Sequence, residues 1–361
     1  MFFWGILGIM QDFLFPGVII LRKFKFKSRF ITHLIAAICL SLVINYGLVF
    51  WLTFLHLYNR PTIFIILACE LFAIDRLYWP EINKPIEKWF QKFYTLIQKA
   101  FASRNEKFQK ASKTSALLSA LQIVYLLGGI GLAYIAWKWI FKLFIWNIGS
   151  VFNSYDAILS WNEWALGWAK NSLPVSTWRY PQLLPTIWSM LYVFIGRTDI
   201  QFFGQAIMPL FALLIIVMMI DLGFAKKNIG FFIAAALTHL TLKRFLGSFI
   251  IEGLADMPAV FFAFSAVYLL LIYRSSLNVS DNQWVFEILI LVAAAGAAIS
   301  KQIGLIFLFL FSIVYLIFIF KPTFKQNRKE AGMGLLRMAM LVLIIVLPWY
   351  PYKQILIWQG V

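Results

Sequence analysis

Residues 284–320 read WVFEILILVAAAGAAISKQIGLIFLFLFSIVYLIFIF. The stretch contains two apolar runs, 284–300 and 303–320, which are separated only by Lys301 and Gln302. Apolar runs of about 18 residues with few charges are long enough to cross the hydrocarbon core of a bilayer as helices. The stretch therefore predicts two membrane-spanning helices joined by a short turn that carries a lysine.

The composition extends this prediction to the whole chain. Of its 361 residues, 62% are hydrophobic and only 13% are charged, whereas about a quarter of the residues in a soluble domain carry a charge. A soluble globular domain is thereby excluded, and we expect an all-α, polytopic transmembrane helical bundle of about 9–10 spans. The predicted spans are 2–21, 31–56, 61–79, 116–137, 203–221, 229–246, 256–273, 284–300, 303–320 and 334–350.

The basic residues are distributed unevenly among the loops. The chain has 32 Lys and Arg against 15 Asp and Glu, which gives a net charge of +17. Roughly two thirds of the basic residues fall in segments that an alternating topology places on one side, and cytoplasmic loops carry such an excess. The charge therefore predicts orientation and requires no nucleic-acid partner. The segments assigned to the cytoplasm are 22–29, 76–115, 222–228, 274–283 and 321–337.

Three regions are predicted along the chain. Residues 1–80 form N-terminal transmembrane helices, residues 81–115 a cytoplasmic amphipathic helix and linker, and residues 116–361 the main membrane module. In the middle region, apolar residues recur every three or four positions between 85 and 101, and lysines fall off that stripe. Such a helix lies in the headgroup region of the inner leaflet or docks a protein partner, and its periodicity fits both interpretations.

The loop 147–202 on the opposite side is long and rich in tryptophan. Trp161, Trp164 and Trp168 form an aromatic stripe at helical spacing. Indole rings are stable at a membrane surface because one edge is apolar and the other polar. We therefore expect short helices that lie along the outer membrane surface.

Polar residues near the predicted outer ends of the spans are the candidates for chemistry. Charged groups at one membrane face are costly unless they pair or bind something charged, which makes them a functional-site hypothesis. Alternative roles exist, because Ser154, Asp156 or Asp256 could cap a helix, and Arg244 could reach lipid headgroups. The candidates are Asp156, Glu163, Arg179, Tyr180, Gln182, Arg244, Glu252, Asp256, Lys301 and Gln302.

Motifs for other chemistry are missing from the sequence. His33, His56 and His239 have no metal-ligand spacing, so no metal site is expected. The chain also has no nucleophile elbow, phosphate-binding loop or dinucleotide fingerprint. We predict no cofactor, and a divalent metal has no support in the sequence.

Four motifs together resemble the polytopic GT-C glycosyltransferases, in particular the bacterial branch related to protein mannosyltransferases and to the aminoarabinose transferase of lipid A. They are SYDAILSWNEWA (154–165), RYPQLLP (179–185), EGLADMPAVFF (252–262) and KQIGL (301–305). The resemblance covers roughly residues 115 to 350. Many relatives carry two adjacent acidic residues in the first motif, whereas here Asp156 is followed by Ala157.

The resemblance implies an inverting transferase in a bacterial inner membrane, with its active site on the periplasmic side. It would move a sugar from a polyprenyl-phosphate carrier to a glycan, lipid or protein acceptor. Asp156 would be the general base, and Arg179, Lys301 and Arg244 would stabilise the phosphate. Glu163 and Asp256 would orient these cations or hold sugar hydroxyl groups.

Two other functions fit the same composition. A transporter or flippase for a lipid-linked glycan would use the outer cations to bind a pyrophosphate, and it predicts charged residues along a path through the bilayer. A non-catalytic membrane scaffold would use the amphipathic helix 85–101 as its docking site.

Overall fold

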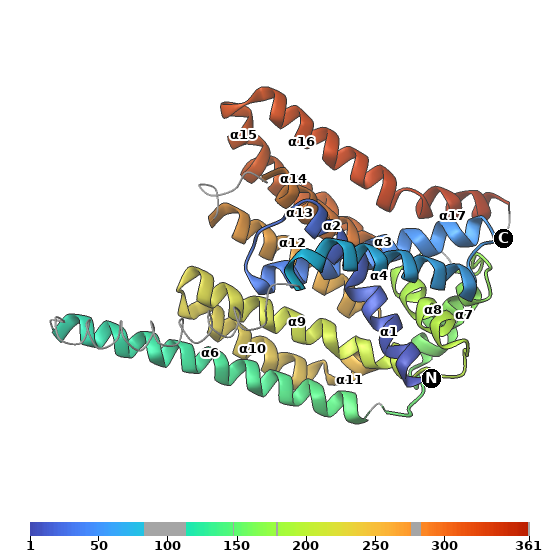
Figure 1. The fold of residues 1–361 in the computed structure, drawn as a ribbon, viewed down its shortest axis with the longest axis horizontal. Helices are drawn as coiled ribbons and strands as arrows, with labels where there is room; N and C mark the ends of the chain where they lie inside the picture. The colour runs from blue at the N-terminus through green and yellow to red at the C-terminus, as the bar shows by residue number, and fades with distance from the viewer. Residues whose placement is uncertain (83–112, 147, 178–179, 276–282, 360–361) are drawn as a thin grey trace.

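The computed structural model describes residues 1–82, 113–146, 148–177, 180–275 and 283–359 (Figure 1). All regular elements in these ranges are helices, so the predicted all-α fold is confirmed. The N-terminal helices are α1 Phe2–Phe13, α2 Phe15–Lys23, α3 Phe30–Phe54 and α4 Arg60–Ile82. The middle helices are α6 Lys113–Trp146, η1 Ala157–Asn162, α7 Glu163–Ala169, α8 Leu183–Ile195, α9 Phe202–Lys226, α10 Ile229–Phe245 and α11 Gly247–Ile251. The C-terminal helices are α12 Asp256–Ser275, α13 Gln283–Ser300, α14 Ile303–Tyr315, η2 Leu316–Phe320, α15 Lys321–Gln326, α16 Arg328–Leu341, η3 Val342–Val346 and α17 Trp349–Trp358.

The described helices support a polytopic membrane protein. Six of them are long and apolar enough to cross a membrane, and the number rises to 8 if each of two bent helix pairs is one span. Two further predicted spans correspond to α4 and α10. Helix α10 is not among the eight because it has only 17 residues. Helix α4 is long enough, but it carries three charged residues, Glu70, Asp75 and Arg76. The predicted amphipathic helix 85–101 lies outside the described residues.

One hydrophobic core joins the N-terminal helices to the rest of the bundle. Its buried side chains come from α1, α2 and α3 as well as from α8, α9, α12 and α13. Helix α13 is the most enclosed, with 83% of its span buried, whereas the spans within α6 and α14 are only 22% and 28% buried. The outward faces of α6 and α14 are apolar, as expected for helices that contact lipid.

The first predicted span is two helices rather than one. Helices α1 and α2 meet at Leu14 with a bend of 40°. Pro16 has no backbone N–H to donate to the Asp12 carbonyl, which interrupts the helical hydrogen bonds. Asn45 on α3 compensates, because its side-chain amide donates to the Asp12 carbonyl at 3.4 Å and to the neighbouring Gln11 carbonyl at 2.8 Å. The break is therefore supported by a buried polar contact from α3.

The turn between α13 and α14 requires glycine. A Cβ atom added to Gly304 would lie 1.9 Å from the carbonyl oxygen of Ala297. By contrast, a Cβ atom on Gly332 of α16 would meet nothing within 4 Å. The two glycines are therefore a matched pair for a test of packing.

We expect Gly304→Ala to lower the free energy of unfolding by about 1–3 kcal/mol, because the backbones of α13 and α14 must separate. Gly332→Ala should leave it unchanged or raise it slightly, since alanine is the better helix former. Thermal unfolding of both variants in detergent measures the difference. Equal melting temperatures for the two variants would contradict the close contact at Gly304.

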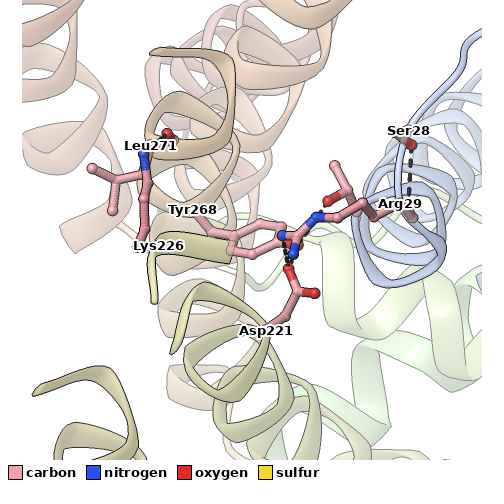
Figure 2. A network of polar contacts seen from close by, with 7 residues as sticks. Ser28, Arg29, Asp221, Lys226, Tyr268 and Leu271 are labelled. Atoms are coloured by element: carbon pink, nitrogen blue, oxygen red, sulfur yellow. Dashed lines mark hydrogen bonds and ion pairs between the residues drawn. The ribbon is translucent and has the colours of Figure 1, made fainter. Parts of the chain in front are cut away.

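The helices alternate between two ends of the bundle (Figure 1). The end that carries α7, α8 and α17 is called the loop end here. At the other end, called the basic end, Arg29 forms an ion pair with Asp221, and Tyr268 donates to the same carboxylate at 2.6 Å (Figure 2). This contact joins α3, α9 and α12. It lies beside two of the segments that the sequence assigned to one side, 22–29 and 222–228.

Candidate functional site

Asp156 lies at the loop end, directly before η1, which is followed by α7. Its side chain is exposed and makes no capping hydrogen bond. Ser154 has that role, because the Ala157 N–H donates to the Ser154 hydroxyl oxygen at 3.2 Å. Ser154 rather than Asp156 is therefore the cap of this helix, and the Asp156 carboxylate has no capping role. The π-helical turn that follows, Ala157–Asn162, is a rare conformation that often occurs at functional sites.

Ser154 also joins the motif 154–165 to the motif 252–262. Its hydroxyl donates to the backbone carbonyl of Glu252 at 3.0 Å. Nearby, the ring of Phe152 stacks on Trp188 with centroids 4.2 Å apart. Gly253 lies against both rings with φ of +81°, and a Cβ atom there would be 2.8 Å from Trp188. Only glycine fits this position without strain, which explains the glycine in the motif 252–262.

Asp256 and Lys301 join the motif 252–262 to the motif 301–305. Asp256 begins α12, and Lys301 lies in the turn between α13 and α14. The ammonium of Lys301 donates to the Asp256 carboxylate at 2.6 Å. The two side chains are 28% and 44% exposed, so both the pair and its surroundings are accessible. The three motifs that carry Asp156, Asp256 and Lys301 are thus linked at the loop end.

Tyr180 packs its ring against two tryptophans of the first motif. Its ring centroid lies 5.6 Å from that of Trp161 and 6.1 Å from that of Trp164. Tyr180 remains 36% exposed, whereas the two tryptophans are buried. Together the three rings form an aromatic cluster with one accessible member.

The predicted aromatic stripe at the outer membrane surface is wrong in its placement. Trp161, Trp164 and Trp168 are all buried and pack into the bundle. A stripe at helical spacing marks the side of a helix that is covered, and it does not reveal whether protein or lipid covers it. The residues between Asp156 and Glu163 form a π-helix, so the seven-residue spacing of the two acids does not place them on one face as it would in an α-helix.

Gln182 is buried and holds the loop, so it has no access to a bound ligand. Its side-chain oxygen accepts from the Trp168 indole N–H at 3.1 Å, and its amide donates to the Tyr180 carbonyl at 3.1 Å. We expect Gln182→Met to lower the free energy of unfolding by about 1–3 kcal/mol, because the indole N–H loses its partner. The same change at the exposed Gln302 should have little effect. Thermal unfolding of the two variants tests this, and equal destabilisation would contradict it.

The remaining candidates are dispersed. Glu163, Arg244 and Gln302 are exposed, and Glu252 is half-buried. Arg179 lies outside the described residues. Arg197 and Asp199, at the same end, form a bidentate ion pair in which the hydrogen bond lowers the pKa of Asp199 and raises that of Arg197. The Asp199 carboxylate is occupied by its two hydrogen bonds from Arg197, so we do not include this pair in the candidate site.

Sequence reasoning did not include the contribution of α17. The Trp349 indole N–H donates to the Tyr180 carbonyl at 2.9 Å, and the buried Lys353 ammonium donates to the Val175 carbonyl. Both residues support the backbone on either side of Arg179. The only available signal was that Trp349 and Lys353 are four residues apart, one helical turn, just after Pro348.

Comparisons with known proteins give no relative. No protein-family model, curated protein or solved structure matches this chain. In the described part of the chain, no group of three or more His, Cys, Asp and Glu side chains is arranged to hold a metal ion. The fold and the site therefore define this protein as an all-α integral membrane protein with a polar cluster at its loop end.

Proposed function

We propose that this protein is a membrane glycosyltransferase that takes a sugar from a polyprenyl-phosphate donor and transfers it to an acceptor at the loop end. The observation that carries the proposal is the connection of three separate motifs. Ser154 contacts Glu252, and Asp256 pairs with Lys301. An exposed carboxylate, a second carboxylate and an accessible ammonium thus come to one end of an apolar bundle.

The residue chemistry supports the reaction type. Asp156 is exposed and has no competing capping role, so it can accept the proton of an acceptor hydroxyl as that oxygen attacks the sugar carbon. The bond from the sugar carbon to the phosphate oxygen breaks, and the phosphate leaves with added negative charge. Lys301 is suited to stabilise that charge, and Asp256 holds its ammonium in place. Arg179 and Arg244 are further candidates for the phosphate.

An apolar cavity provides a place for the prenyl chain of the donor. It has a volume of about 360 Å³ and lies among α2, α3, α13 and the η3 segment, with Tyr46, Phe50, Val292, Ile345 and Pro348 in its wall. The wall is nearly all carbon, which suits a hydrocarbon chain. Pro348 directly precedes Trp349, whose indole contacts Tyr180. One residue of the cavity wall is thus next in sequence to a side chain that contacts Tyr180 at the loop end.

The proposal is tested with purified protein in liposomes. Polyprenyl-phosphate donors with labelled sugars are supplied together with membrane extract as the source of acceptors, and transfer of label to lipid or protein is measured. Mass spectrometry of glycolipids and glycoproteins from a deletion strain identifies the missing sugar and its acceptor. Unchanged glycans in that strain, together with no transfer from any donor, would refute the proposal.

Flipping of a lipid-linked glycan is the second candidate, and one observation favours it. Asp12 is fully buried at the break between α1 and α2, and neither carboxyl oxygen has a hydrogen-bond partner among the described residues. Intramembrane carboxyl groups often mark transport paths. Movement of labelled carrier lipid across proteoliposomes without covalent transfer, abolished by Asp12→Leu and retained in Asp156→Asn, would favour the flippase.

A further inference from the structure

Three cationic side chains converge at the basic end from three different helices. Arg29 precedes α3, Lys226 ends α9, and Arg274 lies near the end of α12. The Lys226 ammonium bonds the carbonyl of Leu271, one helical turn before Arg274, and Arg29 pairs with Asp221 on the same helix as Lys226. Figure 2 shows Arg29 and Lys226 on either side of Tyr268. Like charges held together are unfavourable unless an opposite charge compensates for them.

The described residues supply only part of that compensation. The carboxylate of Asp221 accepts from Arg29 and from the Tyr268 hydroxyl, which itself lies 2.9 Å from the Thr32 hydroxyl. Among the described residues, no carboxylate lies within ion-pair distance of Lys226 or Arg274. In the described part of the chain, Asp221 therefore balances Arg29, and Lys226 and Arg274 have no carboxylate partner.

These two cations keep hydrogen-bond donors available. Lys226 uses one of its three N–H groups to bond the Leu271 carbonyl at 2.9 Å. The guanidinium of Arg274 lies over the ring of Phe318 on η2, 4.7 Å from its centroid, and makes no hydrogen bond to another described residue. Phosphate oxygens are strong acceptors for such charged donors.

The surroundings identify the kind of anion. Phe30, next to Arg29, is 77% exposed, and Ile229, just beyond Lys226, is 64% exposed. The cations thus lie where long apolar helices end and exposed apolar side chains begin. Basic pockets between transmembrane helices bind anionic lipid headgroups in this situation. We infer that Arg29, Lys226 and Arg274 form a binding site for the phosphate of an anionic phospholipid, a site separate from the proposed transferase site.

The test uses the purified full-length protein in detergent. Phosphatidylglycerol, phosphatidylcholine or inorganic phosphate is added at equal concentration, and retained lipid is counted by native mass spectrometry while the melting temperature is followed. We expect phosphatidylglycerol to be retained and to raise the melting temperature, because a ligand that binds the folded state stabilises it. The variant Lys226→Gln/Arg274→Gln should lose retention by on the order of tenfold or more.

Two controls separate lipid binding from loss of charge or of fold. Lys170→Gln/Lys243→Gln removes two exposed cations at the loop end and should retain the lipid as the wild type does. Lys226→Arg/Arg274→Lys keeps both charges and should retain most of it. The inference is overturned if the Gln variant binds phosphatidylglycerol normally, if phosphatidylcholine binds equally well, or if inorganic phosphate stabilises the protein to the same degree.

Discussion

Replacing Asp156 by asparagine should lower the rate of sugar transfer by about two to four orders of magnitude. The amide is nearly isosteric with the carboxylate but cannot accept the acceptor proton, and general base catalysis contributes about this much to enzymatic rates. The stability of the protein should be unchanged, because the Asp156 side chain is exposed and Ser154 caps the helix. Transfer of label from polyprenyl-phosphate sugar is the measurement, with melting temperature as the check on folding.

Asp199 offers a matched control for this variant. It is also an exposed aspartate at the loop end, but its carboxylate is occupied by Arg197. Asp199→Asn should therefore transfer sugar at the wild-type rate. A normal rate for Asp156→Asn, or an equal loss in both variants, would remove Asp156 from the role of general base.

Lys301→Ala should lower the transfer rate by about 100- to 1,000-fold while it changes stability little. A preorganised charge on the leaving group is worth that much in the transition state. The ion pair with Asp256 is partly exposed, and exposed pairs contribute about 1 kcal/mol or less to stability. The large effect is therefore expected on the reaction, and it can be measured without the complication of unfolding.

A double variant separates the catalytic role of Lys301 from simple pairing. If Lys301 serves only to neutralise Asp256, then Lys301→Ala/Asp256→Ala should recover activity, because no unpaired carboxylate remains. If Lys301 acts on the phosphate, the double variant should be as slow as Lys301→Ala. Lys301→Arg, which keeps the charge, should retain part of the activity. Recovery in the double variant would contradict the proposed role of Lys301.

Much of the fold could be predicted because membrane spans are visible in the sequence. The apolar run 303–320 and its neighbour 284–300 correspond closely to helices, and the lysine between them lies in the turn as expected. The break at Leu14 was harder to find, because its cause is distributed between Pro16 on one helix and Asn45 on another. A hydropathy pattern reports the length of an apolar run and not the hydrogen bonds that interrupt it.

Part of the candidate site could also be predicted, but from the positions of charged residues and not from apolar runs. Asp156, Asp256 and Lys301 stood out because charges next to apolar runs are costly, and the structure brings their segments together. Gln182 was also selected, although it is buried and bonds Trp168. A polar residue that stabilises a loop and one that contacts a ligand have the same sequence signature. Only the burial of the side chain distinguishes them.

The contacts of α17 bear on how the protein is made. Trp349 and Lys353 hold the carbonyl groups of Tyr180 and Val175, yet they are translated some 170 residues later. During synthesis the carbonyl groups of Val175 and Tyr180 gain these hydrogen-bond donors only after α17 has emerged from the ribosome and the insertion machinery. The loop end is then completed last, so a nascent chain interrupted before α17 would enter the membrane with most of its helices but without a finished site.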